Sequence, residues 1–212
     1  MHISLSLWSV DQARVAAEVR RFDPLVTSYH VDVADGRFAE NLLFGPMMVE
    51  VLDRLTDKPI IVHLMVDEPH RWVFPFVDAG ADVIAFHPSA RSDIAATVAM
   101  VHRAGAAAGM AVKLDEPHEP ALEHLKLFAE LFVMATPIGV KGHAFEGSAV
   151  ERVQSFVAAR ADNAAPAIFV DGGIRWSSVG PIAAAGADGV VAGSILAATE
   201  DPAYAAAEIQ RL

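Results

Sequence analysis

The sequence predicts an α/β protein that folds as a single (β/α)8 TIM barrel domain over residues 1–212. Its length is the first reason, because one barrel of this kind usually occupies about 200 to 250 residues. The second is a hydrophobic content of 53% with no polar low-complexity tract, which is enough for a sizeable core. The third is an alternation of short apolar or β-branched runs with Ala-rich segments of helical period, the pattern of a parallel sheet covered by helices.

The alternation occurs eight times along the chain. We expect strands near residues 2–8, 26–33, 59–65, 82–87, 109–114, 130–135, 167–171 and 189–192. We expect helices near residues 10–20, 46–55, 69–79, 91–105, 118–127, 147–160, 176–186 and 202–211. An open doubly wound sheet is the alternative, but eight alternations in this length favour a closed barrel. Ala79-Gly80-Ala81-Asp82 recurs as Ala185-Gly186-Ala187-Asp188, as in a barrel of two similar halves.

Composition excludes several kinds of site and partner. The chain has no Cys, so it has neither a disulfide framework nor a thiolate site, and any metal ion must be bound by His and carboxylate groups. It has no run of about 18 apolar residues and no secretory signal pattern, which predicts a cytoplasmic protein without a membrane partner. The net charge of -11 repels phosphate backbones, so nucleic acid is not an expected partner either.

The first strand and the start of the helix after it contain two serines of interest. Ser6 has two open interpretations, a hydroxyl in the barrel mouth or a structural hydroxyl. Ser9 lies three residues before Gln12 and fits a capping box that begins the first helix.

Metal-competent side chains stand at the ends of three strands. His30 and Asp32 occupy alternate positions at the end of the second strand, so they project from the same face. The third strand ends near His63, and the seventh ends on Asp171. Because the strand ends of a barrel converge on one mouth, these four side chains are candidates to bind a divalent cation. A polar rim, or a core histidine bonded to a carbonyl group, is the structural alternative.

Glycine-rich turns follow the last two strands. Asp171 precedes Gly172 and Gly173, and the eighth strand leads into Gly193 and Ser194. Glycines let backbone amides approach a ligand closely, and amide-rich turns after strands seven and eight are the usual phosphate site of such barrels. The sequence therefore predicts a phosphate-binding site beside the four candidate metal ligands.

As an ordered set, these motifs resemble the ribulose-phosphate 3-epimerase family, which includes allulose-6-phosphate 3-epimerase. The matching segments cover nearly the whole chain and are Ser6, His30-Val31-Asp32-Val33-x-Asp35-Gly36, His63-Leu64-Met65-Val66, Val170-Asp171-Gly172-Gly173 and Val191-Ala192-Gly193-Ser194.

The resemblance implies an isomerase of carbohydrate metabolism that inverts C3 of a small sugar phosphate, a ketose phosphate. It implies one divalent metal ion per chain, with Asp32 and Asp171 also acting as proton acceptor and donor. The implied metal ligands are His30, Asp32, His63 and Asp171. The implied substrate contacts are Ser6, Gly172, Gly173, Gly193 and Ser194. To these we add His63 and, on the loop after the sixth strand, Gly139, Lys141 and Gly142 as candidates. Lys141, which departs from the family pattern, has two interpretations: a charge that replaces lost backbone contacts to the phosphate, or a solvated loop lysine. Two His and two carboxylates suit Zn²⁺ first, and they also accommodate Mn²⁺, Fe²⁺ or Co²⁺.

Several segments depart from the family pattern. Ala34 replaces a Met of the cluster beneath the substrate, while Met65 and Met134 keep the other two. The loop over residues 137–143 reads Pro-Ile-Gly-Val-Lys-Gly-His, where the family usually has Asn or Glu followed by Pro-Gly-Phe-Gly-Gly-Gln. Residues 113–117, Lys-Leu-Asp-Glu-Pro, replace a more neutral segment. These changes leave open whether the preferred substrate is ribulose 5-phosphate (with xylulose 5-phosphate as product) or a tetrulose or hexulose phosphate.

The proposed chemistry explains why two carboxylates and a metal ion occur together. Inverting the carbon next to a ketone removes a proton on one face and returns a proton on the other, so two acid-base groups must flank the substrate. The enediolate between these steps carries negative charge that a divalent cation stabilises. A sugar-phosphate lyase or decarboxylase of the same barrel type is an alternative, but it would show Asp-x-Lys-x-x-Asp where this chain has His30-x-Asp32-x-x-Asp35. A non-catalytic sugar-phosphate binding protein is the other alternative, and the retained Asp32 and Asp171 argue against it.

Two further features bear on the branch of the family to which the chain is most similar and on its association into an oligomer. His87-Pro88 after the fourth strand resembles the allulose-phosphate branch more than the pentulose branch. Trp72, Phe74 and Phe76 on the third helix have two interpretations. They form a subunit contact of the homo-oligomer that we expect, or at least two of them pack inward, which their helical spacing favours.

Overall fold

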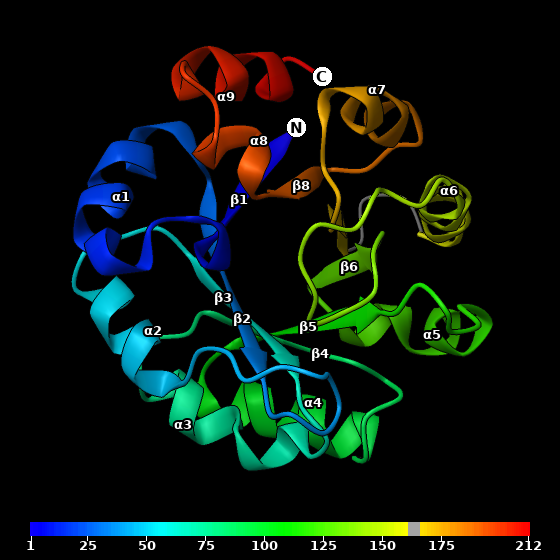
Figure 1. The fold of residues 1–212 in the computed structure, drawn as a ribbon. Helices are drawn as coiled ribbons and strands as arrows, with labels where there is room; N and C mark the ends of the chain where they lie inside the picture. The colour runs from blue at the N-terminus through cyan, green and yellow to red at the C-terminus, as the bar shows by residue number, and fades with distance from the viewer. Residues whose placement is uncertain (161–165) are drawn as a thin grey trace.

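The structure is a computed structural model that describes residues 1–160 and 166–212. Eight parallel strands form a closed barrel in chain order, and β1 pairs with both β2 and β8 (Figure 1). The strands are β1 His2–Ser6, β2 Ser28–Ala34, β3 Ile60–Met65, β4 Val83–Phe86, β5 Ala107–Val112, β6 Glu130–Met134, β7 Ala167–Asp171 and β8 Gly189–Ala192. The predicted barrel is confirmed, and the open sheet is excluded because β1 and β8 are hydrogen-bonded to each other.

Helices surround the barrel in an outer ring (Figure 1). They are α1 Val15–Phe22, α2 Pro46–Asp53, α3 Val73–Val77, α4 Ile94–Ala104, α5 Glu119–His124, α6 Ser148–Ala159, α7 Trp176–Ala184, α8 Ser194–Ala197 and α9 Pro202–Gln210. Short 3-10 turns connect some of them, namely η1 Leu7–Ser9, η2 Gln12–Arg14, η3 Asp23–Leu25, η4 Pro69–Arg71 and η5 Leu125–Leu127. Every predicted helix is present, and α8 is an additional one that is too short to show a helical period in the sequence.

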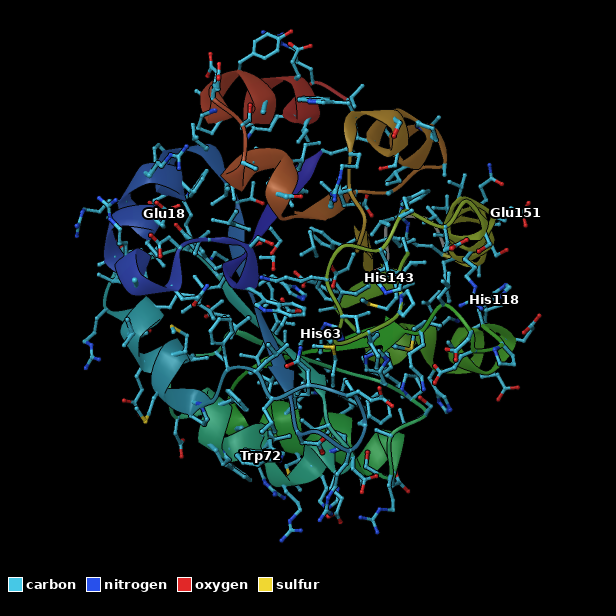
Figure 2. The ribbon with its side chains drawn as sticks, viewed as in Figure 1. Glu18, His63, Trp72, His118, His143 and Glu151 are labelled. Carbon is cyan, nitrogen blue, oxygen red and sulfur yellow. The ribbon has the colours of Figure 1, made fainter. Side chains whose placement is uncertain are left out.

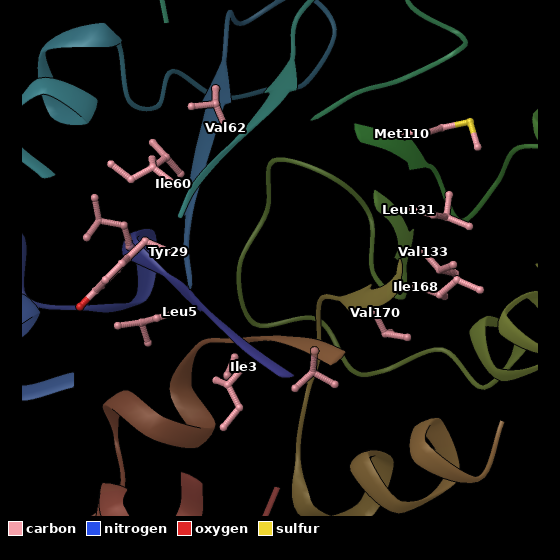
Figure 3. Packing of buried hydrophobic residues seen from close by; sticks show 14 of the residues in the cluster. Ile3, Leu5, Tyr29, Ile60, Val62, Met110, Leu131, Val133, Ile168 and Val170 are labelled. Atoms are coloured by element: carbon pink, nitrogen blue, oxygen red, sulfur yellow. The ribbon is translucent and has the colours of Figure 1, made fainter. Parts of the chain in front are cut away.

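The strand side chains alternate between two cores because successive residues of a strand point to opposite faces. Those that face the helices belong to the main core, of which Figure 3 shows Leu5, Tyr29 and Val62 among others. A smaller cluster fills the barrel interior and consists of Ile61, Val83, Ala85, Ala111, Phe132, Phe169 and Val191. The ring of Phe132 lies 5.2 Å from that of His30, so this inner cluster forms an apolar floor under the polar strand ends.

The recurring Ala-Gly-Ala-Asp segment has the same structural role in both halves. The backbone N–H of Ile60 donates to Asp82 Oδ2 at 2.8 Å, and the N–H of Ile168 donates to Asp188 Oδ2 at the same distance. In each case an aspartate before one strand accepts a hydrogen bond from the beginning of the preceding strand. The repeat therefore joins β3 to β4 and β7 to β8 at the end of the barrel opposite the polar strand ends.

Two sequence interpretations are corrected by the structure. Ser9 does not cap the first helix, because it ends the 3-10 turn η1 and a second turn, η2, lies between it and α1. Instead Asp11 accepts from the N–H of Ala13, and Gln12 Nε2 donates to the carbonyls of Leu7 and Val10.

The expectation that at least two of the three aromatic residues near α3 pack inward is also wrong. Phe76 is fully buried, but Trp72 and Phe74 are each 40% exposed, and the Arg103 guanidinium lies over the Phe74 ring. The homo-oligomer stays a prediction. Within the described residues, no helix combines the length and the apolar character needed to cross a membrane.

Candidate active site

Three strands bring the four predicted metal ligands together at the carboxyl end of the barrel. His30 and Asp32 lie on β2, and His63 is the register partner of Asp32 on β3. Asp171 ends β7 and reaches the same place across the mouth. Each of the four residues offers one ligand atom, and these atoms all lie within 4.8 Å of one another. Figure 2 shows His63 inside the ring of strands, whereas Trp72 lies in the outer layer.

The spacing of the donor atoms fits a four-coordinate metal ion. His30 Nε2 lies 3.5 Å from Asp32 Oδ1 and 3.5 Å from Asp171 Oδ2. His63 Nδ1 lies 3.5 Å and 3.7 Å from the same two oxygen atoms. Ligand atoms about 2.1 Å from a tetrahedral ion are about 3.4 Å from each other. The distances therefore match the edges of a tetrahedron better than they match hydrogen bonds, which are usually shorter.

The metal-facing nitrogens also lack other partners. His30 Nε2 and His63 Nδ1 are buried and accept or donate no hydrogen bond among the described residues. An unpaired buried polar atom costs free energy, so two of them aimed at two carboxylates require an explanation. A cation between the four groups satisfies both nitrogens and offsets the negative charge of the carboxylates.

The two carboxyl groups are perturbed in opposite directions. Burial alone would raise the pKa of Asp32, but His30 and His63 outweigh burial and hold this pKa below its ordinary value. For Asp171, burial dominates and, together with the charge of Asp32, raises the pKa above its ordinary value. The pKa of Asp171 therefore lies above that of Asp32. Over the pH range between the two pKa values Asp32 is ionised and Asp171 is protonated, which is the division expected of a proton acceptor and a proton donor.

Ser6 supports one of these carboxylates. Its buried hydroxyl donates to Asp32 Oδ2 at 3.1 Å, while Asp32 Oδ1 faces the two histidines. Ser6 thus orients Asp32 and favours its ionised form. Of the two interpretations left open by the sequence, the position in the barrel mouth is the correct one.

A cavity of about 340 Å³ lies directly above the four candidate metal ligands. Asp32 and Asp171 form part of its wall, whereas the rings of His30 and His63 are fully buried and do not reach it. The other predicted substrate contacts lie in its wall, and they are Ser6, Gly139, Lys141, Gly142, Gly172, Gly173, Gly193 and Ser194. Met65 and Met134 line it as well, and Ala34 packs beside Met65 without reaching the cavity.

The glycines after β7 and β8 are required by close approaches of the chain. Gly172 has φ of 97°, and a Cβ atom there would lie 2.2 Å from Thr136 Oγ1. A Cβ atom on Gly193 would lie 2.5 Å from Ser9 Oγ. Both turns therefore present backbone to the cavity where a side chain would not fit, which leaves room for an anionic group beside the amides.

The loop after β6, residues 137–143, covers the mouth and is attached to the turn after β1. Lys141 Nζ donates to the carbonyl of Trp8 at 2.6 Å and lies 4.6 Å from the centre of its indole ring. Asn41 Nδ2 donates to the Gly139 carbonyl at 2.8 Å, which attaches the loop to the segment after β2 as well. Burial lowers the pKa of Lys141, and the negative charge of Asp32 opposes this effect.

Sequence reasoning missed several residues of the site. Trp8, Thr136 and Arg175 line the cavity, and each lies within three residues of a residue that was singled out. Their proximity in sequence to the predicted site motifs was the signal that could have identified them. Ser9 lines the cavity as well, although the sequence indicated only a helix cap at that position. His87 was noted only for its dipeptide, yet its Nε2 lies 2.9 Å from Nε2 of His63. By contrast, Lys113 lies outside the cavity wall, where it pairs with Glu116 and contacts the Phe38 ring.

Known proteins are similar to this chain over nearly its whole length. The Ribulose-phosphate 3 epimerase family matches residues 2–197. The chain is 37% identical over 211 residues to ribulose-phosphate 3-epimerase of Mycobacterium tuberculosis, covering 99% of this chain and 91% of the relative. It is 31% identical over 215 residues to ribulose-phosphate 3-epimerase of Bacillus subtilis, covering 98% and 97%.

Solved structures show the same fold at lower identity. KGPDC from Streptococcus mutans, solved as a complex with a ligand, has a TM-score of 0.76 at 17% identity, covering 99% of this chain and 97% of that one. The 3-hexulose-6-phosphate synthase from Salmonella typhimurium has a TM-score of 0.75 at 18% identity, covering 100% and 97%. The fold is shared with both, while the family match and the relatives above assign the chain more narrowly. This chain belongs to the ribulose-phosphate 3-epimerase family.

Proposed function

We propose that this chain, a sugar-phosphate epimerase by its family, inverts C3 of a ketose phosphate with Asp32 and Asp171 as the proton-transferring pair. The observation that carries the proposal is the pair of carboxylates in the cavity wall, whose pKa values are shifted in opposite directions. Ribulose 5-phosphate and xylulose 5-phosphate are the first candidates for the substrate pair, because the named relatives are ribulose-phosphate 3-epimerases.

The two carboxyl groups divide the proton transfers. In one direction the ionised Asp32 takes the proton from C3, and the electron pair of the broken C–H bond moves into the enediolate. The protonated Asp171 then gives its proton to the opposite face of C3, and the ketone forms again. The exchange leaves Asp32 protonated and Asp171 ionised, so the reverse reaction uses the same two groups in exchanged roles. Ser6 keeps Asp32 oriented through its hydrogen bond.

We assign the binding of one divalent ion to His30, Asp32, His63 and Asp171. When bound, such an ion supplies Lewis-acid stabilisation of negative charge on the substrate oxygens. Zn²⁺ suits two imidazoles and two carboxylates best, and Mn²⁺, Fe²⁺ and Co²⁺ are the other candidates. The orphaned His30 Nε2 and His63 Nδ1 support this assignment.

We assign phosphate binding to the turns after β7 and β8. The backbone of Gly172, Gly173, Gly193 and Ser194 lines the cavity, and amides of this kind recognise a dianion even in a chain of charge -11. The name of the structurally similar 3-hexulose-6-phosphate synthase supports a phosphorylated ligand in this type of barrel. Lys141, also in the wall, adds one positive charge near the mouth, and Gly139 and Gly142 contribute loop backbone.

The lyase alternative is disfavoured by the position of Asp35. Its carboxylate accepts hydrogen bonds from the backbone N–H groups of Arg37, Phe38 and Asp67, and it does not line the cavity. The third acidic position of the lyase pattern is therefore used to hold a turn, and the pattern's lysine position is occupied by Asp32.

The test is a panel of tetrulose, pentulose and hexulose phosphates with their unphosphorylated forms, offered to the metal-loaded protein. Exchange of the C3 proton with deuterated water, followed by NMR, reports epimerisation directly. We expect phosphorylated ketoses to exchange well above their unphosphorylated forms. Absence of C3 exchange with every ketose phosphate contradicts the proposal, and equal turnover of unphosphorylated sugars contradicts its phosphate part.

A further inference from the structure

The ring of His87 contacts the ring of His63, one of the four candidate metal ligands. His87 follows β4, the strand beside β3, and its Nε2 lies 2.9 Å from Nε2 of His63. The opposite nitrogen of His63, Nδ1, faces the oxygens of Asp32 and Asp171. One imidazole therefore has its two nitrogens committed to two different neighbours.

The N···N distance determines how protons are shared between the two rings. Two neutral imidazoles at 2.9 Å are hydrogen-bonded only if one nitrogen donates a proton and the other accepts it. A cation needs the lone pair of His63 Nδ1, which moves the proton of that ring to Nε2. His87 Nε2 must then be the acceptor, and its own proton must lie on Nδ1.

The surroundings of His87 suit a neutral acceptor. The ring is fully buried, and it forms no ion pair with any carboxylate of the described residues. An imidazolium without a counter-ion at such a position would be costly. The ring of Phe38 lies 5.1 Å from the ring of His87 and shields it, so water does not compete for the lone pair.

We propose that His87 is a positioning residue, which accepts the Nε2–H of His63 and so fixes the tautomer and orientation in which His63 Nδ1 binds the metal ion. This inference rests on the proposed metal site. Partners of this kind behind a metal-binding histidine typically change metal affinity by about 10- to 100-fold. The role differs from that of the four ligands, because His87 reaches neither the cavity nor the other donor atoms.

Two substitutions at His87 distinguish a role as hydrogen-bond acceptor from a role in packing alone. In His87→Gln the side-chain carbonyl oxygen can still accept from His63, whereas His87→Leu fills similar space without an acceptor. We expect the dissociation constant for Zn²⁺, measured by competition with a chromophoric chelator, to rise about 10- to 100-fold in His87→Leu and to stay within about threefold of wild type in His87→Gln. His118→Leu, which removes a half-buried imidazole beside Phe156, is the control and should not change the dissociation constant for Zn²⁺.

A spectroscopic measurement tests the proton arrangement directly. In the Zn²⁺-loaded protein labelled with ¹⁵N in histidine, we expect the Nε2–H of His63 to show a coupling to Nε2 of His87 across the hydrogen bond. Thermal unfolding of the metal-free variants verifies that each one folds. Affinity equal to wild type in a folded His87→Leu, or a proton attached to His87 Nε2 in the loaded protein, overturns the role of His87 alone. A wild-type protein that binds no Zn²⁺ overturns the metal site together with this role.

Discussion

At the scale of single residues, the site depends on the difference between Asp32 and Asp171. Both are carboxyl groups of the same cluster, yet Asp32 accepts from Ser6 and faces two imidazoles, whereas burial and a neighbouring negative charge dominate at Asp171. The environment, and not the residue type, distinguishes the two roles that we propose for them.

We predict that Asp32→Asn and Asp171→Asn each lower the rate of epimerisation by about 10²- to 10⁴-fold, because each removes one proton-transfer group. One of them can retain exchange of the C3 proton from a single face. Turnover and C3 exchange are measured together with bound metal, since both residues are also proposed ligands.

Asp67→Asn serves as the control for this pair, because Asp67 binds Arg91 outside the cavity. It should keep wild-type turnover. Near wild-type activity in either metal-loaded active-site variant contradicts the assignment.

Glu130 is a second perturbed carboxyl group, at the start of β6 and away from the cavity. Its Oε2 is buried without a partner, and burial raises its pKa to about 7, with His30 opposing the rise. A raised pKa means that the folded state holds this proton more tightly than the unfolded state. Glu130 therefore stabilises the fold fully below its unfolded pKa of about 4.5, and this contribution is lost as the pH rises through about 7.

We predict that Glu130→Gln removes this pH dependence. Relative to wild type, the variant should gain on the order of 2–3 kcal/mol of unfolding free energy at pH 8 and much less at pH 5. Urea unfolding of the metal-free proteins at both pH values measures the difference. Glu123→Gln, an exposed substitution on α5, controls for the lost charge. An equal effect of Glu130→Gln at both pH values would show that Glu130 does not titrate in this way.

At the scale of elements, the loop over residues 137–143 is the part of the site that differs most from the family pattern. Lys141 attaches it to Trp8 by a hydrogen bond and by a cation–π contact. Lys141 lines the cavity, so the loop contributes a charged residue where the family pattern has glycine.

We predict that Lys141→Gln raises the KM for ketose phosphates by about 5- to 10-fold, because one charge-assisted contact to the phosphate is lost. Unphosphorylated ketoses should show no comparable change, and this distinguishes phosphate binding from attachment of the loop. Steady-state kinetics on both substrate forms gives the comparison. Lys126→Gln, an exposed lysine on η5, is the matched control. An equal loss for both substrate forms would assign Lys141 to loop attachment only.

At the scale of the whole molecule, metal binding is expected to couple to stability and to pH. The four donors come from β2, β3 and β7, so a bound ion joins opposite sides of the barrel. Burial lowers the pKa of His30, but Asp32, Asp171 and Glu130 outweigh it and raise this pKa overall; the pKa of Asp171 is raised as well. His30 therefore holds a proton that a cation must displace, whereas Asp171 keeps its proton for transfer in the proposed reaction.

We predict that Zn²⁺ stabilises the chain by about 2.7 kcal/mol at a free concentration of about 100 times its dissociation constant, and that its affinity falls as the pH is lowered. Thermal unfolding with and without Zn²⁺ measures the first effect. Calorimetric titration in two buffers of different ionisation enthalpy counts the protons released. Mg²⁺, which prefers octahedral oxygen ligands, should have little effect. Unfolding that does not change with Zn²⁺, together with no proton release, contradicts the proposed site.

The periodicity of the sequence determined the barrel and most of its site. Strand and helix periods are local properties, and the ends of parallel strands in a closed barrel converge by topology. Positions on β2 and β3 and at the end of β7 therefore sufficed to bring His30, Asp32, His63 and Asp171 together, although His30 and His63 lie within their strands and not at the strand ends that the sequence predicts. The eight predicted strands are all present for the same reason.

The tertiary structure alone decided which residues contact each other across the mouth and around it. Lys141 meets Trp8 over 133 positions of the chain, and His87 meets His63 because β4 lies beside β3 in a particular register. Ser9 lies against Gly193 instead of capping a helix, and Phe74 is exposed despite its helical spacing. Such contacts depend on loop conformation and on closure of the barrel, which hydrophobic periodicity does not encode, because a period describes only the face of one element.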